Sequence, residues 1–95
     1  MNAMTPHGKS PATVLRVGLA RANMTATEFC TRSSFSKGHL SEVLQGRKPV
    51  SPRMAAAAEW VLGDDLGMPA RDLLLLQVNL DLAEAQAQFP PRPRS

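Results

Sequence analysis

The sequence predicts a small all-α fold of five helices without a strand. Three observations predict it: apolar residues recur at helical spacing in successive segments, small polar residues or prolines stand where helices begin, and glycines or prolines stand where they end. At 95 residues the chain is expected to form one domain, near the lower size limit for a self-sufficient core. Because aromatic residues are few, Leu, Val, Met and Ala must supply most of that core.

The first helix is expected over residues 11–22. Ser10 is a suitable N-cap, and Pro11 fits the first turn because the N–H that it lacks would have no partner there. Arg16 and Arg21 lie off the apolar face of this segment. That face consists of Val14, Leu15, Gly18, Leu19 and Ala22. Residues 1–9 are expected to be a flexible arm.

Residues 25–46 predict two short helices joined by a tight turn. Thr25 and Glu28 have the spacing of a capping box, in which each side chain accepts a hydrogen bond from the other residue's backbone N–H. Two apolar residues then share a helical face, two serines interrupt the pattern, and one apolar residue lies in the turn. In chain order these are Phe29, Cys30, Ser33, Ser34 and Phe35.

The second of these helices is expected to begin after Ser36, whose hydroxyl can accept from an N–H of the first turn. Leu40, Val43 and Leu44 form a narrow apolar stripe, and Gly46 ends the helix where a left-handed residue is favoured. Together the two helices form a helix-turn-helix, whose second helix can enter a DNA major groove. Helices this short are not stable alone and need neighbours.

Two more helices are predicted after the motif. Ser51 and Pro52 repeat the cap-plus-proline signal for a helix over 52–62, which is followed by a turn over 64–68. The last helix is expected to run from Pro69 to about Gln88, because the prolines that follow cannot continue it. The expected organisation is a DNA-binding domain over 10–68, a C-terminal helix over 69–89 and a disordered Pro/Arg tail over 90–95.

Residues 11–63 resemble the lambda-repressor-like helix-turn-helix domain of the Xre/Cro family of prokaryotic transcriptional regulators. The resemblance has no gap across 25–46 and extends into the segment GRKPVSPRMAAAAEWVLG. The matching motif residues are the capped start, a small residue at Ser34, Ser36, the aliphatic Leu40 and Val43, and Gly46. Family members typically carry Leu-Ala where this chain has Phe29-Cys30, and Val at the position of Phe35.

Two positions depart from the family pattern. Ser33 replaces a usual apolar residue, which loosens the packing of the first motif helix, and Leu44 stands where many members carry Glu. The stretch LSEVLQG is also similar to the headpiece of the Lac-repressor family. That family starts at the motif itself, so the helix over 11–22 favours the Xre/Cro assignment.

The resemblance implies that the second motif helix lies in the major groove and that its first turns reach the bases. The base-reading candidates are Lys37, Gly38, His39, Ser41 and Glu42. Lys37 can donate to guanine, and Glu42 can accept from cytosine or repel wrong sites. Ser41 can donate or accept, and His39 can do so according to its tautomer. Gly38 lets the backbone approach the groove closely. The phosphate-contacting candidates are Thr25, Ser36, Gln45, Arg47, Lys48 and Arg53.

The charge distribution agrees with a DNA-binding role. Residues 1–62 contain eight Lys or Arg and three acidic residues, whereas residues 63–95 contain three Arg and five acidic residues. The motif therefore lies in the basic part of the chain, as expected if that part meets phosphates.

Other classes of function lack their residues. The chain has no evident nucleophile-and-base grouping, no glycine-rich phosphate loop and no paired carboxylates, so we expect neither an enzyme nor a cofactor. His7 and His39 are a distant pair, so no metal site is expected. One cysteine excludes an internal disulfide. No apolar run is long enough for a signal peptide or a membrane span, so a cytoplasmic protein is expected.

The last helix carries two apolar stripes, and one suffices to cover a small domain. The stripe expected to pack on the domain is Leu73, Leu76, Leu80, Ala83 and Ala87, beside a polar face of Gln77, Asp81, Glu84 and Gln88. The second stripe, Leu75, Val78, Leu82, Ala85 and Phe89, is expected to form a homodimer interface together with Trp60. Alternatively the helix uses both stripes on its own domain, or binds a partner protein as an adaptor or antitoxin would.

Overall fold

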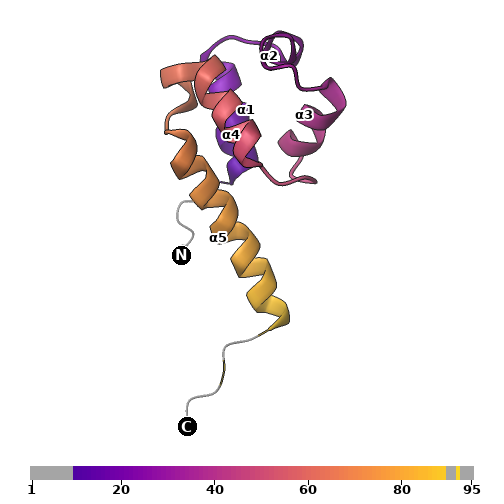
Figure 1. The fold of residues 1–95 in the computed structure, drawn as a ribbon, viewed down its shortest axis with the longest axis vertical. Helices are drawn as coiled ribbons and strands as arrows, with labels where there is room; N and C mark the ends of the chain where they lie inside the picture. Colours follow the sequence, from indigo (N-terminus) through magenta and orange to yellow (C-terminus); the bar gives the residue numbers. More distant parts are fainter. Residues whose placement is uncertain (1–9, 90–91, 93–95) are drawn as a thin grey trace.

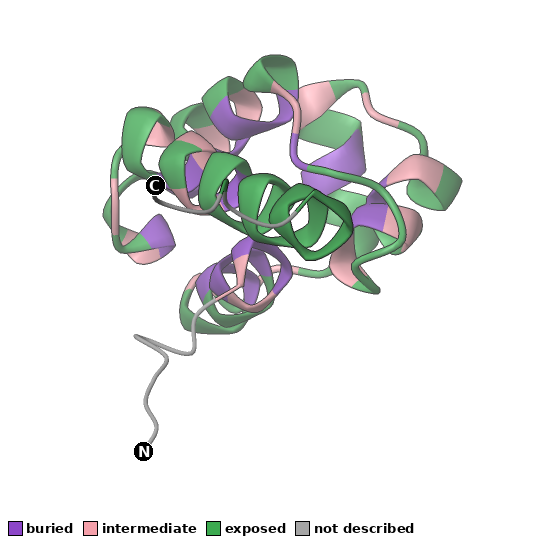
Figure 2. Cartoon of the chain, turned by 90° about the horizontal axis from the view of Figure 1, so that it is seen from below, coloured by how far each residue is buried: buried purple, intermediate pink, exposed green. Residues whose placement is uncertain are grey.

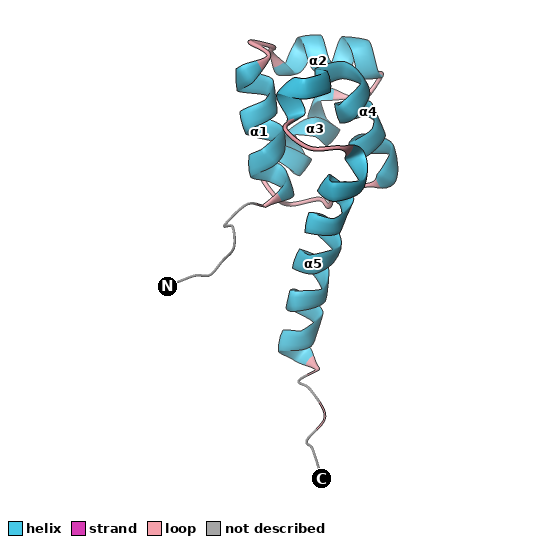
Figure 3. Cartoon of the chain, turned by 90° about the vertical axis from the view of Figure 1, so that its left-hand side faces the viewer, coloured by secondary structure: helices cyan, strands magenta, loops and turns pink. Residues whose placement is uncertain are grey.

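The computed structural model describes residues 10–89 and Arg92. Over these residues it contains five α-helices, one 3-10 helix and no strand (Figures 1 and 3). The elements are α1 (Pro11–Arg21), α2 (Ala26–Ser33), α3 (Lys37–Leu44), α4 (Pro52–Leu62), η2 (Gly63–Leu66, the 3-10 helix) and α5 (Ala70–Gln88). The predicted all-α class with five helices is thus confirmed for this part of the chain. The expected arm over 1–9 and, apart from Arg92, the expected tail over 90–95 lie outside the described residues.

The predicted helix starts are confirmed. Three serine hydroxyls each accept a hydrogen bond of 3.1 Å from the backbone N–H three residues later, in the pairs Ser10–Thr13, Ser36–His39 and Ser51–Met54. Thr25 and Glu28 form the predicted capping box, with Thr25 Oγ1 accepting from the Glu28 N–H at 3.1 Å and Glu28 Oε1 accepting from the Thr25 N–H at 2.9 Å. These bonds satisfy donors that the first helical turn leaves unpaired, so local sequence sets where the helices begin.

The helix ends also follow the sequence. Gly46 and Gly63 have φ values of 78° and 55° just after α3 and α4, where the sequence predicts a stop. Ser34 ends α2 in the same left-handed region, with a φ of 68°, although it is not glycine. A side chain with a Cβ is strained there, so the α2–α3 turn stores some backbone strain.

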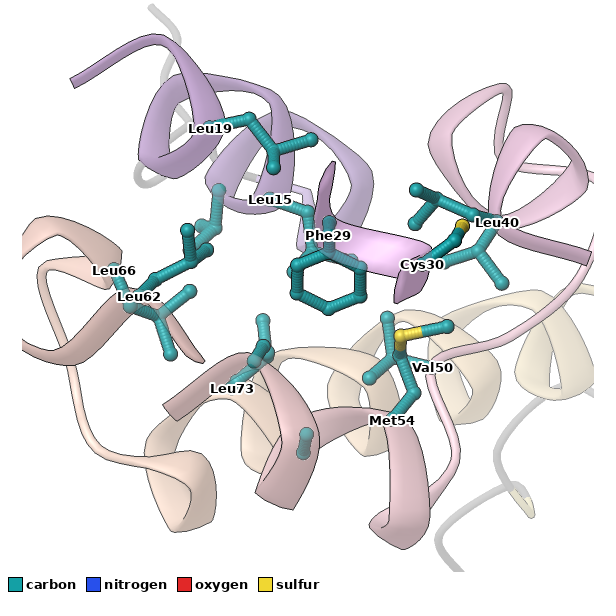
Figure 4. Close-up of a cluster of buried hydrophobic side chains, with 14 residues drawn as sticks. Leu15, Leu19, Phe29, Cys30, Leu40, Val50, Met54, Leu62, Leu66 and Leu73 are labelled. Atoms are coloured by element: carbon teal, nitrogen blue, oxygen red, sulfur yellow. The ribbon is translucent and has the colours of Figure 1, made fainter. Parts of the chain in front are cut away.

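The hydrophobic core lies where α1, α2, α3, α4 and the first turns of α5 converge. Phe29 lies in the middle of it, with its ring surrounded by side chains from the other helices (Figure 4). The largest fully buried side chains are Phe29, Leu15, Leu40, Met54, Leu73 and Val43. Helices α1 to α4 each contribute apolar residues from the face that their spacing predicts, and burial of this cluster holds the short helices α2 and α3 in place.

At Gly18, α1 packs closely against the α4–η2 segment. A Cβ added there would lie 3.1 Å from Leu62 Cδ1, 3.3 Å from the Asp65 carbonyl oxygen and 3.3 Å from the Leu66 Cα. The absence of a side chain at Gly18 therefore lets α1 pack directly on backbone.

Two buried residues outside the α-helices were not anticipated in the core. Leu66 lies in the segment expected to be a plain turn, which instead forms η2 and directs this leucine into the core. Val50 lies in the loop before α4 and is also buried. Neither residue belongs to a periodic helical segment, so the spacing argument could not identify them.

Helix α5 differs most from expectation. Only Leu73 and Gln77 are buried, Leu74 and Leu76 are half-buried, and every residue from 78 to 89 is exposed. The stripe expected to cover the domain therefore does so only at Leu73 and Leu76. The alternative in which α5 wraps its own domain with both stripes is wrong, because the second half of the helix projects away from the body (Figure 1).

Gln77 also requires a correction. The helical pattern placed Gln77 on the polar face of α5, but Gln77 is only 8% exposed. It is buried because its side-chain oxygen accepts a hydrogen bond from the backbone N–H of Val50 at 2.8 Å.

Within the described range, no helix combines the length and apolar character that crossing a membrane requires.

Candidate nucleic-acid interface

Helix α3 has one face in the core and one face in solvent. Leu40 and Val43 are fully buried, whereas Lys37, Gly38 and Ser41 are exposed. The helix lies at the edge of the domain and follows α2 after a tight turn (Figure 1). Its aliphatic stripe therefore holds it to the domain while its first turns present polar groups outward.

Nothing in the fold requires a glycine at position 38. A Cβ built at Gly38 would meet no atom within 4 Å, and the residue lies inside the regular helix α3. Glycine weakens a helix interior by about 0.5–1 kcal/mol relative to alanine. The open space beside Gly38 thus lies on the exposed face of α3, where a second molecule has access to the backbone.

His39 is less available than the sequence suggested. The residue is half-buried, and its ring stacks on the ring of Phe35 with centroids 5.3 Å apart and planes inclined by 23°. Its Nε2 atom is shielded from solvent and has no hydrogen-bond partner among the described residues. This nitrogen cannot contact a base in the observed arrangement, which limits the two-way role expected for the imidazole.

Phe35 organises a small cluster at the start of α3. The guanidinium carbon of Arg53, on α4, lies 5.0 Å from the centroid of the Phe35 ring, within the range of a cation–π contact. Phe35 therefore contacts both His39 on α3 and Arg53 on α4. Sequence reasoning missed this Phe35 cluster, although the Phe where the resembling family has Val was a signal for it.

The later part of α3 is linked by side-chain pairs. The carboxylate of Glu42 forms an ion pair with Arg47, with 3.4 Å between Oε2 and Nη1. The amide of Gln45 donates to the hydroxyl of Ser41 at 2.8 Å. Both pairs are exposed or half-buried, so each contributes little stability, but together they orient four of the candidate residues.

The basic loop after α3, residues 47–49, is held by main-chain hydrogen bonds. The backbone N–H groups of Arg47 and Lys48 both donate to the carbonyl oxygen of Glu42, at 2.9 and 3.3 Å. Arg47 and Lys48 are themselves exposed. The loop therefore presents two cations from a fixed backbone next to α3.

The N–H and hydroxyl of Thr25 are already hydrogen-bonded within the capping box of α2. Its hydroxyl accepts from the Glu28 N–H and lies 3.3 Å from Glu28 Oε1, and its N–H donates to the same carboxylate. These bonds hold the pKa of Glu28 below its usual value. The carboxylate already occupies the place that an anion would take at the start of α2, which weakens the case for Thr25 as a phosphate contact.

Helix α5 exposes, along most of its length, the apolar stripe that the sequence assigned to an interface. Leu75, Val78 and Leu82 are 53%, 55% and 52% exposed, and Ala85 and Phe89 are exposed as well. At 100° per residue, this stripe lies on the side of the helix away from Leu73 and Gln77. Viewed from below, the second half of α5 is exposed on all sides (Figure 2).

Trp60 is separate from this stripe in position, although it is equally open. It is 77% exposed and points away from the core face of α4. With Arg32 and Val61 it lines a shallow depression between α2 and α4. The expected interface residues thus fall into a stripe on α5 and a single aromatic residue on α4.

Cys30 is a buried residue of α2. Burial raises the pKa of the Cys30 thiol, and the nearby charge of Lys37 offsets this in part. In the region 10–89, no group of three His, Cys, Asp or Glu residues is arranged to hold a metal ion.

The chain matches no protein-family model and no curated protein.

Proposed function

We propose that this protein is a sequence-specific double-stranded DNA-binding transcriptional regulator of the lambda-repressor-like helix-turn-helix type. The observation that carries the proposal is α3, whose aliphatic stripe is buried while Lys37, Gly38 and Ser41 face solvent at its beginning. A helix held in this way can insert its first turns into a major groove. The proposed location is the cytoplasm, in association with the nucleoid.

The roles of the individual residues divide by their surroundings. Lys37, Gly38 and Ser41 are the base-reading residues of this proposal, with Glu42 and the accessible part of His39 beside them. Other residues would contact the phosphates and position the helix without reading sequence. These are the exposed cations Arg47, Lys48 and Arg53, together with Gln45 and Ser36. Thr25 is the weakest of these candidates, because the carboxylate of Glu28 already occupies its anion position.

The proposed functional unit is a homodimer that represses transcription from a pseudo-palindromic operator. The support is the exposed apolar stripe on α5, since isolated apolar stripes of this length on a surface helix are typical of interaction sites. Pairing through α5 would place two α3 helices about 34 Å apart, or a multiple of that distance, over two half-sites.

Selection of bound sequences from a random duplex pool tests this function. A pseudo-palindromic consensus is the expected result, with an affinity that falls by about 0.9 log units per log unit of salt for each neutralised phosphate. Absence of binding to any duplex at low salt would contradict the proposal.

A second candidate function uses only α5. The same apolar stripe, with Leu75, Val78 and Leu82 open to solvent, would also fit a partner protein, as in an adaptor or in an antitoxin that binds its toxin and represses its own operon. A pure adaptor would form a complex with a partner protein but would bind no duplex. An antitoxin would do both, and its dimer contacts would be separable from its partner contacts.

A further inference from the structure

Gln77 occupies an unusual position for an amide side chain. It is the one buried polar residue found in the described part of the chain, and both ends of its amide are paired. Its Oε1 accepts from the Val50 N–H at 2.8 Å, and its Nε2 donates to Asp81 Oδ1 at 2.9 Å. Burial of an amide is unfavourable unless its groups are hydrogen-bonded, so these two bonds account for its place in the core.

The Val50 N–H depends on this contact. Val50 is buried and follows Pro49, which has no N–H of its own, so the loop offers few main-chain bonds at this end. At its other end, the N–H groups of Arg47 and Lys48 donate to the Glu42 carbonyl oxygen. The loop over 47–49 is therefore anchored to α3 on one side and, through Gln77, to α5 on the other.

Asp81 fixes which way the amide of Gln77 points. A carboxylate only accepts hydrogen bonds, so it pairs with the NH₂ end and leaves the oxygen facing Val50. Asp81 lies one turn after Gln77 and is exposed, so it orients the amide without being part of the core. The series Asp81, Gln77, Val50 thus runs from the surface of α5 to the backbone of the loop.

We propose that Gln77 is a positioning residue that holds the basic loop over 47–49 in its DNA-contacting place and couples it to α5. The inference rests on the proposed function, since it concerns the loop that carries Arg47 and Lys48. The inference also goes beyond the proposed function. Helix α5, which would form the dimer, would also hold in place the loop that carries the phosphate-contacting Arg47 and Lys48.

The test replaces Gln77 with Met, which has a similar length but is apolar and offers the Val50 N–H only a weak thioether acceptor in place of the amide oxygen. Gln77→Met is expected to speed exchange of the Val50 amide by about tenfold or more relative to the Leu40 amide, as measured by NMR on the free protein. On a labelled mixed-sequence duplex, its salt slope should fall by about one to two, because each phosphate contact contributes about 0.9. Gln88→Met, at the exposed end of α5, should change neither value.

Two further variants separate positioning from general loss of structure. Asp81→Ala changes only a surface residue and is expected to shift both readouts in the same direction by a smaller amount. The double variant Gln77→Glu with Asp81→Asn restores an acceptor for Val50 and a donor for residue 77, and is expected to recover much of the salt slope. Sedimentation of each variant at the same concentration shows whether dimerisation is retained.

The outcomes are distinguishable. If the wild type and Gln88→Met bind the duplex while Gln77→Met and Asp81→Ala bind it with an unchanged salt slope, the inference is overturned and the proposed function stands. Unchanged protection of the Val50 amide in Gln77→Met would overturn it as well. Failure of the wild type to bind DNA at low salt would overturn the proposed function, and the positioning role with it.

Discussion

The guanidinium of Arg53 lies 5.0 Å from the centre of the Phe35 ring, and this contact joins the start of α4 to the turn before α3. The other ring contact of Phe35 is with His39, on α3 itself. One half-buried aromatic residue therefore sets the positions of two polar side chains at the edge of the proposed DNA-binding surface.

Phe35→Val should release both side chains. A cation–π contact at an exposed site contributes about 0.5–1 kcal/mol, and the smaller side chain buries less area, so the free energy of unfolding should fall by about 1–2 kcal/mol. Denaturant titration measures this change. Phe35→Tyr keeps the ring and serves as the control. If the valine variant were as stable as the wild type and bound duplex with the same salt slope, the cluster would have no positioning role.

Gly38→Ala should separate folding from binding. Alanine favours the helix over glycine, and its Cβ would meet nothing in the fold, so the free energy of unfolding should rise by about 0.5–1 kcal/mol. Affinity for the selected operator should fall, because the new methyl group would stand between the backbone and the groove. A combined denaturant and fluorescence-anisotropy series measures both effects.

Gly46→Ala provides the contrast for that experiment. Gly46 also has open space around it, but its φ is 78°, so alanine is strained there and the variant should be less stable than the wild type. A Gly38→Ala protein that is both more stable and an equally good DNA binder would remove the close approach of α3 from the proposal.

The capping box should make α2 sensitive to acid. The backbone N–H and hydroxyl of Thr25 hold the pKa of Glu28 below its usual value, so the folded state favours the carboxylate. This contribution is fully present above the pKa of the unfolded chain and is lost as the pH falls through the lower pKa of the folded state. The melting temperature of Glu28→Gln should therefore lie below that of the wild type at neutral pH and approach it in acid.

Thermal melts at several pH values measure this gap. Glu84→Gln, on the exposed half of α5, is the control, and its gap to the wild type should stay small throughout. A Glu28→Gln protein with the same melting temperature as the wild type at pH 7 would mean that the charge of the carboxylate adds nothing to the stability of the capping box.

Lys37→Ala and Arg47→Ala should have different effects on DNA binding. Loss of Lys37 should relax base preference at one position, by about 1–3 kcal/mol. Loss of Arg47 should weaken binding to all sequences alike and reduce the salt slope by about one. Competition with operator variants, repeated at several salt concentrations, measures both. Identical behaviour of the two variants would contradict the division between reading and positioning.

Leu82→Arg should disrupt the proposed dimer without unfolding the domain. Leu82 is 52% exposed and lies beyond the part of α5 that packs on the core, so a charge there should cost the monomer little. Analytical ultracentrifugation should change from dimer to monomer, and affinity for a two-half-site duplex should fall. Gln88→Arg, on the exposed polar face of α5, is the charge-matched control. A wild type that sediments as a monomer at tens of micromolar would contradict the dimer.

The features that could be predicted from the sequence are those set by neighbouring residues. Ser10 with Pro11, Ser51 with Pro52 and the stop at Gly63 fixed helix bounds to within a residue of those observed, because caps and stops depend on local hydrogen bonds and φ preferences. The buried stripe of α3 followed in the same way, since burial of Leu40 and Val43 repeats at helical spacing.

The features that could not be predicted depend on contacts between distant segments. Gln77 was assigned to a solvated face because nothing in α5 indicates that the N–H of Val50 needs an acceptor. How many residues of α5 pack on the core depends on the size of the rest of the domain, which the pattern of α5 does not reveal. Periodicity describes one helix at a time and does not contain this information.

Glu42 contacts the basic loop through both its backbone and its side chain, and this affects how the proposed DNA-binding surface could evolve. Its carbonyl oxygen receives two N–H groups of the basic loop, and its carboxylate pairs with Arg47. Replacement of Glu42 to alter base preference would also remove the ion-pair partner of Arg47. Base preference and phosphate contact would therefore change together. Ser41 has a similar linkage, because its hydroxyl accepts from the Gln45 amide. Retargeting that begins at Lys37 avoids both linkages, which makes that position the easier starting point for new specificities.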